Sequence, residues 1–157
     1  MSTDRPAPWK VIAGATLLVG ILDISDAFIF YGLRGITPTR TLQGIASGVL
    51  GRTAFGMGRS SALLGLFFHF FIAFSATTVF LFASRKLPLA RHPWLYGALF
   101  GIALYVVMNY IVLPLSKIGL RPTPPLIPLL NGVAALVFCI GIPLAFIARR
   151  FVVHQTS

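Results

Sequence analysis

Residues 11–33 read VIAGATLLVGILDISDAFIFYGL, an apolar run that contains two aspartates, Asp23 and Asp26. As a helix this run is long enough to cross about 30 Å of hydrocarbon, at about 1.5 Å per residue. An ionised carboxylate in hydrocarbon costs several kcal/mol unless it is paired, hydrated or protonated. The chain has only three acidic residues. Two of them in one run predict a polar site inside a membrane-spanning bundle.

Composition extends this interpretation to the whole chain. Its 157 residues are 57% hydrophobic and 10% charged, whereas a soluble domain carries about 25% charged residues. Helices are expected throughout, because an isolated strand would leave its backbone groups unpaired in lipid. We therefore predict an all-α membrane protein, a single integral membrane domain over residues 1–157. Its four transmembrane helices form a bundle and span about 11–33, 61–83, 94–115 and 126–148.

The first connection, residues 34–60, has a pattern of its own. Apolar residues recur there at helical spacing: Leu42, Ile45, Ala46, Val49 and Leu50. This pattern predicts a short amphipathic helix over about 39–51, lying flat near the membrane face opposite the termini. Arg40 lies at its start, and Arg52 and Arg59 follow it. They are candidates to bind an anionic headgroup or substrate at the mouth of a site, and interfacial snorkelling is the alternative.

The polar side chains within the four spans share one depth range. Counted from the face opposite the termini, four lie roughly 8–12 Å deep and two roughly 15 Å deep. The first group is Asp26, His69, Asn109 and Asn131, and the second is Asp23 and Tyr105. Because all four spans contribute, we predict one shared site for a ligand or a proton.

Asp23 and Asp26 are three residues apart and share a helix face. Two carboxylates so close cannot both ionise cheaply, and a shared proton or a cation would relieve the repulsion. Arg59 or protonated His69 could supply that cation. We expect Asp26 to be the partner of His69, because their depths agree more closely.

A structural alternative stays open for each of these residues. Asp26 could lock the helix register through a hydrogen bond, and His69 could be a buried structural donor. Asn109 and Asn131 could serve as interhelical hydrogen-bonding groups.

The net charge of +10 does not predict a nucleic-acid partner, because the basic residues lie at the ends of apolar runs and no RNA-binding motif is present. The expected partner is the lipid bilayer. The single cysteine, Cys139, excludes an intrachain disulfide. No metal-ligand spacing or cofactor motif is found, so no metal and no cofactor are expected. No catalytic motif appears either, and a non-enzymatic protein is expected, with a lipid-modifying activity through the arginines left open.

Glycine and proline positions predict how the spans pack. Gly97 and Gly101 form a GxxxG pattern, which is typical of close helix packing within a chain, of a homodimer, or of contact within a larger membrane complex. Pro114 and Pro143 predict kinks near span ends. An even number of spans places both termini on one side. Basic residues divide almost evenly between the two faces, and we favour cytoplasmic termini because arginines crowd the span ends there.

Three segments carry a family resemblance: LQGIASGVLG at residues 42–51, LGLFFH at residues 64–69, and Met108-Asn109 followed by Pro114. Together they resemble uncharacterised bacterial four-span inner-membrane proteins and are distantly similar to the YagU-like group. That group also has a histidine-bearing span and a proline that ends a later span. The resemblance covers about residues 14–115. It implies four helices and a bacterial inner-membrane location, and it supplies no activity.

Two functions fit these patterns. The first is a membrane bundle whose polar site binds or conducts a proton or a small polar solute. The alternative is a non-catalytic accessory or scaffold subunit of a membrane complex.

Overall fold

The computed structural model describes residues 8–153, except residues 90, 120–121 and 123. Its helices are arranged as four long segments and one short one, with no strand among the described residues. The first and second long segments are α1 (Pro8–Gly32) and α3 (Gly58–Lys86). The third comprises α4 (Pro93–Val107), η2 (Met108–Val112) and α5 (Leu113–Leu115), and the fourth α6 (Leu126–Ala135), η3 (Leu136–Gly141) and α7 (Ile142–Val153). All four are long and apolar enough to cross a membrane, which confirms the all-α prediction.

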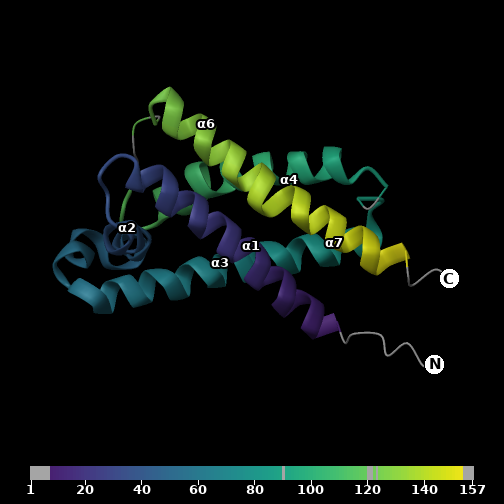
Figure 1. Ribbon diagram of the computed structural model, residues 1–157, viewed down its shortest axis with the longest axis horizontal. Helices are drawn as coiled ribbons and strands as arrows, with labels where there is room; N and C mark the ends of the chain where they lie inside the picture. Colours follow the sequence, from purple (N-terminus) through teal and green to yellow (C-terminus); the bar gives the residue numbers. More distant parts are fainter. Residues whose placement is uncertain (1–7, 90, 120–121, 123, 154–157) are drawn as a thin grey trace.

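The long segments lie side by side as a bundle, with both chain ends at the same end (Figure 1). At the opposite end lies α2 (Pro38–Leu50), seen end-on in this view and therefore crossing the bundle axis. The predicted amphipathic helix is thus confirmed, with bounds within one residue of those expected at each end. A 3-10 turn, η1 (Gly51–Gly56), joins it to α3.

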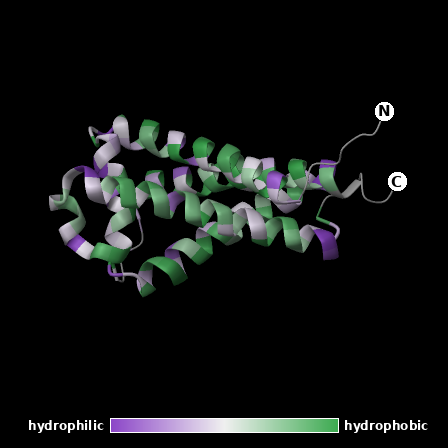
Figure 2. Cartoon of the chain, turned by 90° about the horizontal axis from the view of Figure 1, so that it is seen from below, coloured by the Kyte–Doolittle hydropathy of each residue, from purple (hydrophilic) through white to green (hydrophobic). Residues whose placement is uncertain are grey.

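The surface of the bundle is suited to lipid. On α3, an apolar stripe at helical spacing is exposed, from Leu63 through Phe67 and Phe71 to Phe74. Figure 2 shows hydrophobic residues along the long helices and strongly hydrophilic ones mainly towards the two ends. An exposed apolar surface of this extent is typical of a membrane-embedded face. The chain therefore has the features of a multi-pass membrane protein.

The core between the helices is built largely from small side chains. Ala15 of α1, Ala73 of α3 and Ala145 of α7 are at most 4% exposed, and they surround the buried Phe80. Small residues matter here because lipid supplies no hydrophobic force between helices, and close van der Waals contact must hold them together.

Local hydrogen bonds explain where α2 begins and how it is held. The Thr37 hydroxyl accepts a hydrogen bond from the Arg40 backbone N–H, which caps the helix, and Pro38 opens it without losing a needed donor. Gln43 Nε2 donates to the Gly58 carbonyl at 3.0 Å. The Lys117 backbone N–H donates to the Gly48 carbonyl, so the connection between the third and fourth spans also contacts α2.

Gly65 sets the distance between α2 and α3, because a Cβ there would overlap the backbone carbonyl of Leu42. Gly65→Ala is expected to lower the free energy of unfolding by about 1–2 kcal/mol, since α2 must shift away from α3. Gly14→Ala is the matched control, because a Cβ on Gly14 meets nothing within 4 Å. Thermal unfolding in detergent, followed by circular dichroism, measures both. Equal melting temperatures for the two variants would contradict the prediction.

Gly97 and Gly101 pack within the chain. A Cβ on Gly97 would lie 2.7 Å from Ile142 Cα, and one on Gly101 2.5 Å from Val137 Cα. Both glycines are buried against the fourth span, opposite Gly141. The intramolecular alternative is therefore confirmed for this GxxxG pattern, and a homodimer would need another surface.

A π-helical segment precedes each of the two prolines that were predicted to kink their spans. The residue before Pro114, Leu113, donates its N–H to the Met108 carbonyl, and Ile142, before Pro143, donates to Val137. Both are i→i+5 bonds. Proline lacks an N–H and its ring clashes with the carbonyl four residues earlier, and a wider preceding turn relieves both problems. Pro114 and Pro143 therefore mark two places where the helix departs from regular α geometry, through a widened turn in η2 and in η3.

Candidate functional site

A cavity of about 520 Å³ lies in the half of the bundle remote from the termini. Its walls come from the second half of α1, the end of α4 with η2, the beginning of the fourth span, and the connection between the third and fourth spans. Five of the predicted site residues line it: Asp23, Asp26, Tyr105, Asn109 and Asn131. The depth argument therefore identified side chains that the fold brings together from three spans.

The two aspartates have different neighbours. Asp26 Oδ2 accepts a hydrogen bond from Asn131 Nδ2 at 2.9 Å, across 105 residues of sequence. Asp23 Oδ2 lies 3.9 Å from Nδ1 of His69, which is beyond hydrogen-bond range. The expectation that Asp26 pairs with His69 is wrong. Depth along a helix does not specify rotation about its axis, and rotation places Asp26 towards the fourth span and Asp23 towards α3.

His69 lies behind the cavity and not in its wall. The side chain is buried, and Nε2 lies 2.8 Å from the Gly20 carbonyl oxygen of α1. A carbonyl oxygen can only accept, so Nε2 carries the hydrogen. This leaves Nδ1, the nitrogen that faces Asp23, free to take up a second proton. His69 thus joins α1 to α3 and is also the basic group closest to a cavity carboxylate.

Tyr105 and Asn109 come from the third span, where helical spacing puts them on one face. Asn109 Nδ2 donates to the Tyr105 carbonyl at 3.0 Å, within its own helix, so it does not link two helices as the structural alternative supposed. The Tyr105 side chain is 8% exposed and packs over Gly132 of α6, where a Cβ would lie 2.9 Å from its ring. The glycine therefore makes room for the tyrosine beside the cavity.

The arginines predicted at the mouth are not in the cavity wall. Arg40, Arg52 and Arg59 are all exposed, on α2, η1 and the start of α3. The Arg40 guanidinium lies over the Phe55 ring at 4.7 Å. Their positions follow from α2 and η1, which pack on α3 at this end of the bundle. Within the described chain they belong to the surface at that end.

Sequence reasoning missed three aromatic residues that also line the cavity: Phe30, Tyr31 and Tyr110. The sequence did contain a signal for Phe30. Asp23, Asp26, Ala27 and Phe30 follow the i, i+3, i+4, i+7 spacing of one helix face. In an apolar span this spacing is hidden, because lipid-facing and cavity-facing aromatic residues look the same in sequence.

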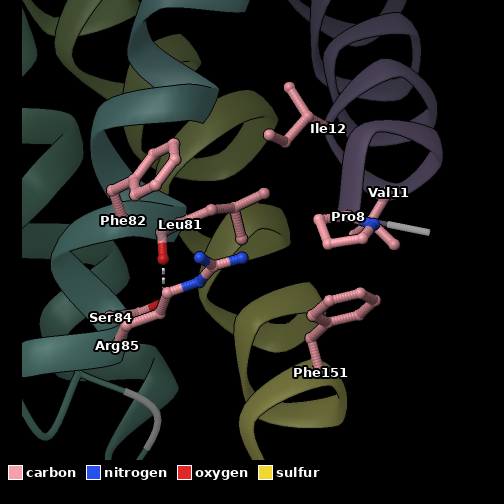
Figure 3. Close-up of a pocket in the computed structure, with 8 residues that line it drawn as sticks. All are labelled: Pro8, Val11, Ile12, Leu81, Phe82, Ser84, Arg85 and Phe151. Carbon is pink, nitrogen blue, oxygen red and sulfur yellow. Dashed lines mark hydrogen bonds between the residues drawn. The ribbon is translucent and has the colours of Figure 1, made fainter. Parts of the chain in front are cut away.

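No group of three His, Cys, Asp or Glu side chains that could hold a metal occurs among the described residues. A small pocket near the chain ends, lined by α1, α3 and α7, has room for about 20 Å³. Figure 3 shows the Arg85 side chain reaching into it beside Leu81 and Phe151, with a bond from the Ser84 hydroxyl to the Leu81 carbonyl. It is too small for more than a water molecule.

Comparison of the chain with protein-family models, curated proteins and solved structures finds no match. The resemblance to the YagU-like group stays a prediction. Function must therefore be argued from the cavity itself.

Proposed function

We propose that this protein binds or conducts a proton or a small polar solute through its intramembrane cavity. The observation that supports it most is the position of Asp23 and Asp26 in the wall of a cavity between membrane-spanning helices. Ionisable groups at membrane depth are costly and are typical of ion pathways and substrate sites. Asp23, with His69 behind it, offers two groups that can each hold a proton.

One of the two aspartates in the cavity wall lacks a hydrogen-bond partner among the described residues, which favours a binding role for the pair over a structural one. Asp26 is bonded to Asn131, but Asp23 has no hydrogen bond among the described residues. A purely structural pair would gain most from complete mutual satisfaction, because unpaired polar groups in a bundle cost free energy. The cavity leaves Asp23 access to a solute or to water instead.

The test is flux in proteoliposomes, with a pH-sensitive dye inside and a pH step or a solute gradient across the membrane. Asp23→Asn and Asp26→Asn are each expected to slow the protein-dependent rate by about tenfold or more, the effect of about 1.4 kcal/mol of lost interaction. The control is Asp4→Asn, which makes the same charge change before α1 begins and outside the described residues. If both α1 variants behave like the unmodified protein, the carboxylates are structural and the proposal fails.

The accessory-subunit alternative has lost one of its supports. It drew on Gly97 and Gly101 as a surface for a partner, and both contact the fourth span of the same chain. Purification from native membranes in mild detergent discriminates the two functions. A stoichiometric partner would favour the accessory role, whereas recovery of this chain alone favours the cavity.

A further inference from the structure

We propose that the solute of this cavity is an organic cation, an amine or quaternary ammonium group on an apolar body. The inference rests on the proposed function, because it names the solute class of the same cavity. Four features of the lining support it: its charge, its aromatic rings, the Tyr105 hydroxyl, and its size.

The charge of the lining is negative. Asp23 and Asp26 are its only ionisable carboxyl groups, and no lysine or arginine side chain occurs among the described lining residues. Carboxylates in a low-dielectric site favour a positive ligand. Arg121 falls between the lining residues Gly119 and Pro122 in the sequence but lies outside the described residues, so the test below includes an anionic probe.

Aromatic rings surround the same space. Phe30, Tyr31, Tyr105 and Tyr110 come from two spans, and rings of this kind bind ammonium groups through their electron-rich faces. One ring already holds a cation, since the Arg34 guanidinium lies 3.6 Å from the Phe30 centroid. Arg34 itself is not in the cavity wall. The three tyrosines have no such cation over their rings among the described residues.

Tyr105 adds a polar group to the lining. Its side chain is 8% exposed, and its hydroxyl forms no hydrogen bond with any described residue. An ammonium N–H or a water carried with the ligand would fit beside it, because the hydroxyl oxygen can accept.

The size of the cavity and its apolar walls fit a small organic molecule better than a bare inorganic ion. About 520 Å³ lies in the range of pockets for small organic molecules, which is roughly 300–1,000 Å³. Ala27, Met108, Leu113 and Leu136 supply apolar wall. A hydrated metal ion would gain nothing from these side chains, whereas the hydrocarbon part of an amine would be desolvated against them.

The test uses three probes of one shape: phenyltrimethylammonium, its neutral isostere tert-butylbenzene, and benzenesulfonate. Each is radiolabelled and dialysed to equilibrium against the full-length protein in lipid nanodiscs, and empty nanodiscs correct for partition into lipid. The cation is expected to bind at least about tenfold tighter than the isostere and tighter than the anion. Saturable binding of the isostere or the anion at equal or higher affinity would overturn the proposal, as would no saturable binding of the cation.

Two kinds of variant refine the result. Asp26→Asn should weaken the binding of phenyltrimethylammonium by about tenfold and leave the binding of tert-butylbenzene unchanged. Tyr110→Leu removes one aromatic ring at a position that is 63% exposed, so the bundle should stay folded. This variant should weaken the binding of phenyltrimethylammonium by about threefold. Asp4→Asn is the control and should change nothing. Cation binding that is unaltered in both Asp26→Asn and Tyr110→Leu would place the cation elsewhere and refute the inference.

This inference and the proposed function can fail separately. If the cation does not bind but proton flux in liposomes still depends on Asp23 and Asp26, the solute class is wrong and the cavity function stands. If the aspartate variants change neither flux nor binding, both proposals are refuted.

Discussion

Replacing Gly101 by valine is expected to lower the free energy of unfolding by about 3 kcal/mol. A Cβ at this position would lie 2.5 Å from Val137 Cα and 2.7 Å from the Leu136 carbonyl oxygen. Both are backbone atoms, and they belong to the π-helical segment η3 that Pro143 requires. The third and fourth spans would have to separate along their contact, because neither atom can rotate away as a side chain would.

The measurement is thermal or denaturant unfolding of the purified protein in detergent, with Gly14→Val as the matched control on a lipid-facing position of α1. A Cβ on Gly14 meets nothing within 4 Å, so the control reports only the change in backbone freedom. The third and fourth spans also form two walls of the cavity. Gly101→Val should therefore reduce flux as well, and a stable, fully active variant would show that this contact is not essential.

Replacing His69 by leucine is expected to lower the free energy of unfolding by about 2 kcal/mol, because it leaves the Gly20 carbonyl without its partner from α3. His69→Gln is the conservative variant. A glutamine amide can still donate to Gly20, so it should retain most of the stability. It has no basic ring nitrogen like the Nδ1 that lies 3.9 Å from Asp23 Oδ2.

The pair of variants separates two roles for this histidine. Unfolding measurements in detergent test the structural one, and leucine and glutamine variants of equal stability would contradict it. Proton flux in liposomes tests the other. A stable His69→Gln protein with slow flux would place His69 on a proton path, and unchanged flux would restrict it to joining α1 and α3.

Much of the architecture could be predicted from the sequence because lipid leaves few choices. A run such as residues 11–33 must be helical, since its backbone has no other partner in hydrocarbon. Predicted span ends were close to the observed ones, with α1 and α3 each beginning three residues early, at Pro8 and Gly58. Those extra residues are polar or interfacial, and a hydrophobicity criterion excludes them although the helix continues.

The amphipathic helix was also predictable, to within one residue at each end. Its apolar positions repeat at helical spacing while its polar positions do not, and Thr37-Pro38 gives it a clear start. What the pattern did not specify is that Gly65 would seat it against α3. Consequently the arginines that follow it lie away from the cavity wall.

The candidate site could be predicted by depth but not by pairing. Counting residues from the span ends grouped Asp23, Asp26, Tyr105, Asn109 and Asn131 correctly, because helix rise is constant. It paired Asp26 with His69 where the structure has Asn131. Helix rotation decides that pairing, and in these spans the sequence contains little information on rotation, since side chains facing lipid and side chains facing the core are equally apolar.

The sequence by itself thus determined the number of spans, the interfacial helix, the shared end for both termini, and the depth of the polar residues. These follow from the length of apolar runs and from the need to satisfy every backbone group in lipid. Only the tertiary structure decided which faces meet. Close glycine contacts at Gly65 and Gly101 set the rotation and spacing of the helices, and the widened turns before Pro114 and Pro143 shape the third and fourth spans. The cavity exists because of those contacts, and no single segment encodes them.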